Sequence, residues 1–466
     1  MSRQTELIDA AWQSVVAGDA DSPRPEISLV GPSPLLPSHL PVDEVASACV
    51  TAALWAASSL AASRKGAAPA PVSIDRQHVA AAVTSERHFQ HGDEPAPVGF
   101  APLSRFWATS DGWVRTHANY PWHRTALLEC LGVSEDADAI AAAMAERGST
   151  AVEEAVFAAG GIAAAVRSRA DWLRHPQGMA VAREPLISCE RIGDAPSRAR
   201  AECAMPAGDV RVVDLTRVIA GPVGTRFVGA LGADVMRLDP PSRPDVGRPG
   251  TVADTLLAKR SAIVDVAQRE GSETLHRLLD TADVVVCGYR PGALDRFRLD
   301  ANSLAEDHPG LVVVLLDAWG HTGPWASRRG FDSVVQAPTG VAVAETPDGT
   351  APGALPCQLL DHGTGYLAAA AVLDGLRRQS RDGGTIVRRL SLARTAAWLL
   401  EASGEPAERM VAAALSVEPW RASVDTPSGP VSVISPPGAI GDVPLTWPAA
   451  TAYGADASIW LDANAG

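Results

Sequence analysis

The strongest constraint on the fold is a series of apolar, β-branched segments between residues 210 and 320. They read VRVVDL, DVMRLD, SAIVDV, ADVVVCG and GLVVVLLDAWG, and helical segments such as GTRFVGALG and GSETLHRLLDTA alternate with them. Strands that are apolar on both faces and alternate with helices are typical of a parallel sheet covered by helices. The sequence therefore predicts an α/β fold with an open parallel sheet built from Rossmann-like βα units.

The chain length indicates more than one domain, because 466 residues exceed what a single hydrophobic core usually supports. Ahead of the α/β part, FWATSDGWVRTHA carries Asp-Gly between two β-prone runs, which predicts a hairpin, and helical segments follow it. We therefore expect four parts: an N-terminal helix and strand segment at 1–104, a small α+β domain at 105–200, the α/β domain at 208–400, and a C-terminal tail at 401–466 that packs on the α/β domain.

Composition argues against several classes of function. The net charge of −14 disfavours a general nucleic-acid binder, whose affinity comes from neutralising phosphates. No uninterrupted apolar run reaches the ~20 residues of a membrane span, and the N-terminus lacks the apolar core of a secretory signal. We therefore expect no membrane contact. The six cysteines form no CxxC pair and no Cys/His ligand spacing, so we expect no metal site and free thiols in the cytoplasm.

The first βα turn of the α/β part reads RVIAGPVG, residues 217–224. It lacks the GxGxxG pattern, so it does not predict an NAD site. Pro222 at the start of the next helix is compatible with an ordinary βα turn, although a helix N-terminus also attracts anions. Further along, Lys259 and Arg260 stand at the entrance of a buried strand. Such cations are usually solvated or salt-bridged, and they could equally bind phosphates.

The segment VVVCGYRPGALDRF places a turn directly after a buried strand. Ligands of open α/β sheets gather beyond the carboxyl ends of the strands. Tyr289, Arg290 and Arg296 could therefore form a basic, partly aromatic wall for an adenine nucleotide, and the plain alternative is a turn with surface arginines. His321, in the next loop, is more typical of a hydrogen-bonded loop histidine than of a catalyst.

Asp361 lies in CQLLDHGTGYLAAAA, between an apolar pair and a small-residue helix. An N-cap is the commoner role for such an aspartate, and a carboxylate at a helix start can also serve as a nucleophile. His362 points elsewhere on the helix, so a Ser/His/Asp relay is not indicated. Gly363 and Gly365 leave room for a thioester and could offer backbone N–H groups to an oxyanion.

Taken in order, these motifs resemble the class III CoA-transferase family, which includes formyl-CoA transferase and, as a related branch, alpha-methylacyl-CoA racemase. The resemblance covers about residues 209–396 and rests on five segments in the family's order, among them AWGHTGPWASRRGFDSVVQAPTG. It implies coenzyme A rather than NAD as the ligand, and Asp361 as a nucleophile that forms covalent acyl and CoA intermediates. It also implies acyl-CoA and a small carboxylic acid as substrates and a homodimer as the assembly.

The resemblance also predicts which residues contact CoA. They are the turn Val218, Ile219, Ala220, Gly221 and Pro222, the strand entrance Lys259 and Arg260, the loop residues Tyr289, Arg290 and Pro291, and Arg296.

Two departures from the family pattern leave alternatives open. Phe331 stands where racemase-like members carry a histidine, and an acid–base pair needs two titratable groups, so racemisation is disfavoured. The small domain precedes the α/β domain, whereas the family has it afterwards. Residues 43–80 could be a partial copy of the α/β domain with Asp43 in the place of Asp361, so the chain could be a fusion of two copies or a permuted single one. A racemase or epimerase, and a non-catalytic CoA-binding subunit, therefore remain as alternatives to the transferase.

Overall fold

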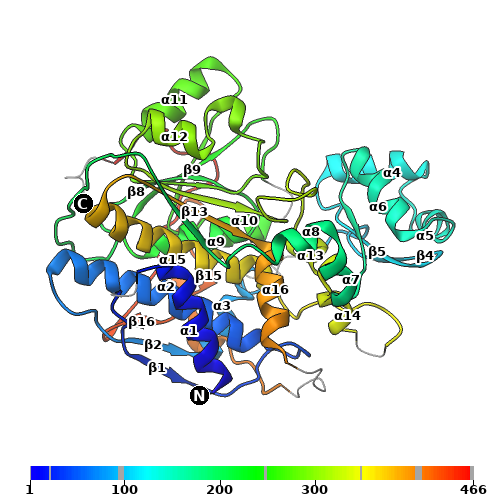
Figure 1. Cartoon of the computed structure of the whole chain (residues 1–466), viewed down its shortest axis with the longest axis horizontal. Helices are drawn as coiled ribbons and strands as arrows, with labels where there is room; N and C mark the ends of the chain where they lie inside the picture. Colours follow the sequence, from blue (N-terminus) through cyan, green and yellow to red (C-terminus); the bar gives the residue numbers. More distant parts are fainter. Residues whose placement is uncertain are drawn as a thin grey trace.

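The structure is a computed structural model and describes residues 2–19, 22–92, 99–245, 249–346, 349–404 and 412–461. Figure 1 shows a large layered body with a smaller domain extending from one side. The chain starts in the layered body, builds the small domain next, and then returns to the body, so the body contains segments from both ends of the sequence.

A seven-stranded sheet forms the centre of the body, in the order β10-β9-β8-β11-β12-β13-β7. Six neighbouring strands are parallel, and β7 is antiparallel to β13. The bounds are β8 (Arg211–Leu215), β9 (Asp234–Asp239), β10 (Arg260–Ile263), β11 (Val284–Cys287), β12 (Val312–Asp317), β13 (Thr385–Ser391) and β7 (Ser188–Ile192). The parallel strands follow the doubly wound order 3-2-1-4-5-6, in which the connections change direction between β8 and β11.

Helices cover both faces of this sheet, because alternate strand residues point to opposite sides. Val212, Val284 and Val312 belong to the core under α9 (Ala220–Ala230) and α15 (Leu359–Asp382). Their neighbours Val213, Val285 and Val313 belong to the core under α11 (Arg269–Leu279) and α12 (Ala301–Asp307). The predicted α/β class with an open parallel sheet is confirmed.

A second, smaller sheet has the order β1-β2-β16-β17. Its elements are β1 (Ile27–Val30), β2 (Val72–Asp75), β16 (Ala439–Ile440) and β17 (Val443–Pro444), with helices α1 (Arg3–Val16), α2 (Val42–Lys65) and α3 (Arg76–Ala82). β1 and β2 are parallel with α2 between them in the chain, α3 follows β2, and β16 is antiparallel to β2. The same pattern recurs in β12, α15, β13, α16 (Leu392–Ala402) and β7.

Helices α2 and α15 occupy corresponding places in these two patterns and pack against each other. Both have 24 residues and begin after a residue with nearly the same backbone angles, φ −77° and ψ 60° at Pro41, φ −79° and ψ 61° at Gln358. Asp43 and Asp361 lie in the respective first turns. By length and composition α2 could cross a membrane, but 94% of its apolar window is buried in the protein.

The small domain contains a hairpin, as its Asp-Gly pair predicts, and a cluster of short helices. Its elements are β4 (Phe106–Thr109), β5 (Gly112–Thr116), α4 (Pro121–Leu131), α5 (Ala137–Ala145), α6 (Ser149–Ala158), β6 (Ala163–Ala165), α7 (Arg169–Arg174) and α8 (Pro176–Val181). The predicted small domain at 105–200 includes β7, but in the structure β7 belongs to the large sheet. It pairs antiparallel with β13, whose edge is free to accept another strand.

The C-terminal segment runs over both sheets. β14 (Arg421–Val424) and β15 (Val431–Ile434) form a small sheet with β3 (Gln90–His91), and β16 joins β2. Farther on, Asp456 accepts the backbone N–H of Ser261, and the indole of Trp460 donates to Leu278 O. The tail therefore contacts the α/β domain and the N-terminal segment alike.

Candidate active site

The main cavity lies beyond the carboxyl ends of β8 and β11, where the doubly wound sheet changes direction. It encloses about 270 Å³, and this is the place where such folds bind ligands. The loop after β8 contributes Arg217, Val218, Ala220 and Gly221, and the loop after β11 contributes Gly288, Tyr289 and Arg290. Five predicted contact residues therefore line one cavity: Val218, Ala220, Gly221, Tyr289 and Arg290.

Asp361 lines the same cavity from the first turn of α15, and its side chain is 6% exposed. It also lines a smaller inner cavity together with Ile219. The backbone N–H of Asp361 donates to Oδ2 of Asp332, at 2.9 Å. Asp332 is the first residue of α13 (Asp332–Thr339) and follows Phe331, so α13 and α15 are joined at the cavity.

Burial raises the pKa of Asp332 to about 6, although the N–H of Asp361 and the amide of Gln336 favour its charged form. A carboxyl with a raised folded-state pKa holds its proton longer in the native state, so between about pH 4 and 6 it makes stability fall as pH rises. Above pH 6 the native protein contains a buried carboxylate whose charge is only partly compensated.

Asp332→Asn is expected to remove this pH dependence. The stability of the variant relative to the wild type should rise between about pH 4 and pH 6, because only the wild-type side chain loses a proton there and becomes a buried charge. Urea unfolding of both proteins at pH 4.5, 6 and 7.5 measures the effect. A stability difference that stays constant over this range would contradict the assignment.

The turn after β8 is strained at Val218, whose φ is 70°. A positive φ is unusual for a β-branched residue and persists only where the surroundings enforce it. The backbone N–H of Val218 donates to Oδ2 of Asp245, at 3.1 Å. Asp245 also accepts the hydroxyl of Tyr120 from the small domain and pairs with Arg237. Burial works to raise the pKa of Asp245, but the charges of Arg237 and Arg217 outweigh it and hold the pKa below its ordinary value.

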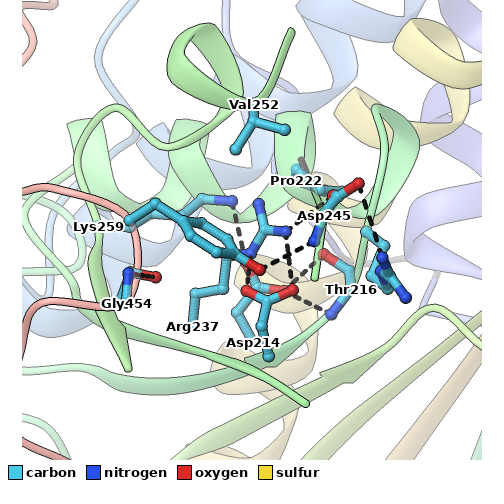
Figure 2. A network of polar contacts seen from close by, with 12 residues as sticks. Asp214, Thr216, Pro222, Arg237, Asp245, Val252, Lys259 and Gly454 are labelled. Atoms are coloured by element: carbon cyan, nitrogen blue, oxygen red, sulfur yellow. Dashed lines mark hydrogen bonds and ion pairs between the residues drawn. The ribbon is translucent and has the colours of Figure 1, made fainter. Parts of the chain in front are cut away.

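A buried polar network supports this turn from below (Figure 2). Asp214, in β8, accepts from Thr216 and Thr225 and forms an ion pair with Lys259 at 2.9 Å. The side chains of Asp214 and Lys259 are fully enclosed. Burial lowers the pKa of Lys259 to about 8, against the opposing effect of Asp214. Lys259 therefore holds β8 and the strand entrance together.

The remaining predicted contact residues do not reach either cavity. Lys259 is engaged with Asp214, and Arg260 pairs with Asp234 and donates to Ile459 O of the C-terminal segment. Arg296 is exposed beside Phe297. Pro222 is buried in the first turn of α9, and Pro291 lies outside the cavity lining.

The two glycines after Asp361 serve helix packing. A Cβ on Gly365 would lie 2.5 Å from Ala220 O, and one on Gly363 would face Sγ of Cys49 at 3.4 Å. Both residues lie inside α15, where backbone N–H groups bond within the helix. They leave no space for a thioester and offer no oxyanion donors, contrary to the sequence prediction.

The two histidines considered from the sequence lie outside the cavity lining. His362 bonds to Glu86 at 3.1 Å inside the protein, and His321 pairs with Asp317 at 3.0 Å.

Sequence reasoning missed the contribution of the small domain. Tyr120, Trp122 and His123 line the main cavity from the start of α4, and His117 lines the inner one. His117 stacks on Phe331, with ring centroids 3.8 Å apart. Burial lowers the pKa of His123 to about 4, helped by the charges of Arg329 and Arg243, so its imidazole is neutral at pH 7. The aromatic residues of THANYPWH were the only local signal for this wall.

Three arginines at the main cavity form no ion pair with a carboxylate in the part of the chain that the structure describes. They are Arg243, Arg290 and Arg329, whereas Arg217 and Arg328 in the same lining pair with Asp245 and Glu154. Burial and the charges of Arg290 and Arg243 lower the pKa of Arg329, as expected for three cations that line one cavity. Such a cluster suits an anion with several phosphate oxygens.

The α/β part of the chain is similar to known proteins. Residues 208–413 match the model of CoA-transferase family III, which confirms the predicted resemblance for the α/β part of the chain. The chain is 34% identical over 192 residues to the probable fatty acyl-CoA transferase Rv3272 of Mycobacterium tuberculosis, covering 39% of this chain and 48% of the relative. It is 30% identical over 188 residues to human succinyl-CoA:glutarate CoA-transferase, covering 38% and 43%.

Solved structures give the same partial coverage. The crystal structure of Rv3272 has 33% sequence identity and a TM-score of 0.40, covering 42% of this chain and 57% of that one. A CAIB/BAIF family protein from Brucella suis has 29% identity and a TM-score of 0.40, covering 48% and 65%. The chain thus spans about half the length of the curated relatives it matches.

Proposed function

We propose that this protein transfers coenzyme A from an acyl-CoA thioester to a carboxylic acid, with Asp361 as the covalent nucleophile. One observation carries the proposal: Asp361 and the three unpaired arginines Arg243, Arg290 and Arg329 line the same cavity. A nucleotide-bearing thioester needs both a cationic site for its phosphates and a reactive group at its acyl end. The relationship to CoA-transferase family III supports the choice of CoA.

The steps follow from the chemistry of a carboxylate and a thioester. Asp361 attacks the thioester carbonyl and expels the CoA thiolate, which gives a mixed anhydride. The thiolate then attacks the aspartyl carbonyl, releases the first carboxylic acid and leaves an aspartyl-CoA thioester. The incoming carboxylate attacks this thioester and expels the thiolate once more. The thiolate finally attacks the acyl carbonyl of the new anhydride, which forms the new acyl-CoA and restores Asp361.

The start of α9 supports the phosphate end of the site. α9 begins at Ala220 in the cavity wall, and its N-cap residue Ile219 makes no side-chain hydrogen bond to the helix end. The first backbone N–H groups of an 11-residue helix therefore add a positive end to the arginine cluster.

Removing one cluster arginine is expected to weaken CoA binding. Arg290→Ala should raise the dissociation constant of CoA about tenfold, because each charge-assisted phosphate contact contributes about 1.5–3 kcal/mol. Arg298→Ala is the matched control, since Arg298 is half-exposed and pairs with Asp307 and Glu306 outside the cavity. Calorimetric titration with CoA measures both, and equal affinities for Arg290→Ala and Arg298→Ala would refute the phosphate site.

A second candidate function is racemisation or epimerisation of an acyl-CoA. Phe331 removes the histidine that the related branch carries, but His123, neutral at pH 7, lines the main cavity with Asp361. Two titratable groups at one cavity are what α-proton exchange requires. Deuterium uptake from D₂O at the α-carbon of a 2-methylacyl-CoA, without transfer to any acid, would favour this function. Tight CoA binding without either reaction would favour the non-catalytic alternative.

The predicted homodimer and cytoplasmic location stay predictions. Within the described residues, α15 is buried from Leu359 to Gln379, and α2 and α9 of the same chain pack along it. A second copy would therefore bind through another surface. Light scattering during size-exclusion chromatography distinguishes the 48.5 kDa chain from its dimer.

A further inference from the structure

The inner cavity lies where the acyl group of a bound thioester would be. It shares Tyr120, Val218, Phe331 and Asp361 with the main cavity, so the two spaces meet at the nucleophile. The arginine cluster lines only the main cavity, which places the phosphates on that side. The inner cavity is thus the space that a thioester's acyl group enters when its carbonyl carbon stands at Asp361.

The inner cavity is small and flat-walled. It encloses about 30 Å³, which is room for about two water-sized groups. Phe331 and His117, stacked at 3.8 Å, form one wall, and Val252 and Ile219 contribute aliphatic surface. An acyl chain that fills this space without moving the walls has about two to four carbons.

Two hydroxyl groups in this cavity have no hydrogen-bond partner among the described residues. They are Oγ of Ser333, on α13, and Oγ1 of Thr251, on α10 (Pro249–Thr255). Ser333 is 4% exposed and Thr251 is 3% exposed, so neither hydroxyl is satisfied by bulk water. A buried hydroxyl without a partner costs free energy. The two groups therefore point to a ligand that supplies a hydrogen-bonding oxygen.

The charges of the cavity exclude an anionic acyl tail. Asp361 and Asp245 both line it, the second with a lowered pKa and hence ionised, and no lysine or arginine is among its described lining residues. The arginines that pair with Asp245 lie outside the lining of this cavity, so a second carboxylate on the acyl group would meet two lining carboxylates and no lining cation, which is costly in an enclosed site. The oxygen of the acyl group is therefore uncharged.

We propose that the inner cavity is an acyl subsite for a short, uncharged acyl group with a hydroxyl or keto oxygen, held by Ser333 and Thr251. The inference rests on the proposed CoA transfer at Asp361 and names its acyl class. This subsite disfavours long fatty acyl groups, which exceed its volume, and dicarboxylic acyl groups, which carry a second carboxylate.

The test compares acyl donors that differ in one property each. Lactoyl-CoA and propionyl-CoA share a carbon skeleton and differ by one hydroxyl, while succinyl-CoA adds charge and octanoyl-CoA adds length. The rate of covalent modification of Asp361 is followed by intact-mass spectrometry. Lactoyl-CoA should react about tenfold faster than propionyl-CoA, the effect of one buried hydrogen bond, and succinyl-CoA and octanoyl-CoA should be slower still.

Variants identify the groups responsible. Ser333→Ala should remove the preference for lactoyl-CoA over propionyl-CoA, and Ser47→Ala should keep it, since Ser47 is another buried, unpartnered hydroxyl but lies in α2. Phe331→Ala should accelerate octanoyl-CoA by opening the wall. The acyl subsite is wrong if succinyl-CoA or octanoyl-CoA modifies the wild-type protein as fast as lactoyl-CoA does. That result would leave the proposed CoA transfer unaffected. No modification by any of the four donors would overturn the transferase itself.

Discussion

Asp361→Asn is expected to abolish CoA transfer, with a loss on the order of 10⁴-fold in kcat, because no other carboxylate in the main cavity can replace the nucleophile without moving. Asp317, the other acid in that lining, is engaged with His321 and Gly320. The affinity for CoA should change only a few-fold, since the arginine cluster is untouched. Steady-state transfer assays and CoA titration separate these two effects.

Asp43→Asn is the matched control for this variant. Asp43 lies in the first turn of α2, the helix that corresponds to α15, and is similarly buried. Its Oδ2 accepts the backbone N–H groups of Leu35 and Leu36, and it lines neither cavity. An amide oxygen can accept the same bonds, so Asp43→Asn should transfer CoA at the wild-type rate. Equal losses in both variants would show that the effect is structural.

Lys259→Ala is expected to give the largest loss of stability. It leaves the Asp214 carboxylate buried with its two hydroxyl donors but without its ion-pair partner, and breaking such a pair from one side costs about 3–5 kcal/mol. The strained turn at Val218 follows Asp214 in the chain and is bonded to Asp245, so CoA binding should weaken as well. Urea unfolding followed by far-UV circular dichroism measures the free energy of unfolding.

Arg260→Ala, one residue away, provides the comparison. Arg260 pairs with Asp234 where both side chains are partly exposed, 14% and 18%, so water reaches the Asp234 carboxylate when the guanidinium is removed. Arg260→Ala should therefore cost less stability than Lys259→Ala, which leaves a fully buried carboxylate. A loss under 1 kcal/mol for Lys259→Ala would contradict the structural role given to the network.

The sheet could be predicted from the sequence because its signals are local. Strands that are buried on both faces appear as continuous apolar runs, and βα turns follow them at fixed places. The position of Asp361 at the start of an apolar helix was readable for the same reason. Its place in the cavity agrees with the nucleophile assignment, which awaits the kinetic test.

The rest of the site depends on contacts between distant segments. Lys259 was expected at the phosphates, but the parallel order of β8, β9 and β10 brings it to Asp214, and no local pattern shows which carboxylate lies across a sheet. His123 and Arg243 come together only because the small domain packs over the carboxyl ends of the strands. Tyr120 and Trp122 are visible in the sequence as aromatic residues, but no local pattern shows that they face the carboxyl ends of the strands.

Trapping the covalent intermediate is the most direct test of Asp361 as the nucleophile. The protein is incubated with lactoyl-CoA, treated with hydroxylamine or borohydride, digested and analysed by mass spectrometry. If Asp361 is the nucleophile, the peptide that contains it is modified in the wild type and in Asp43→Asn, and the modification is absent in Asp361→Asn. Acyl transfer that proceeds with no modification at Asp361, or a modification that persists in Asp361→Asn, would contradict this assignment.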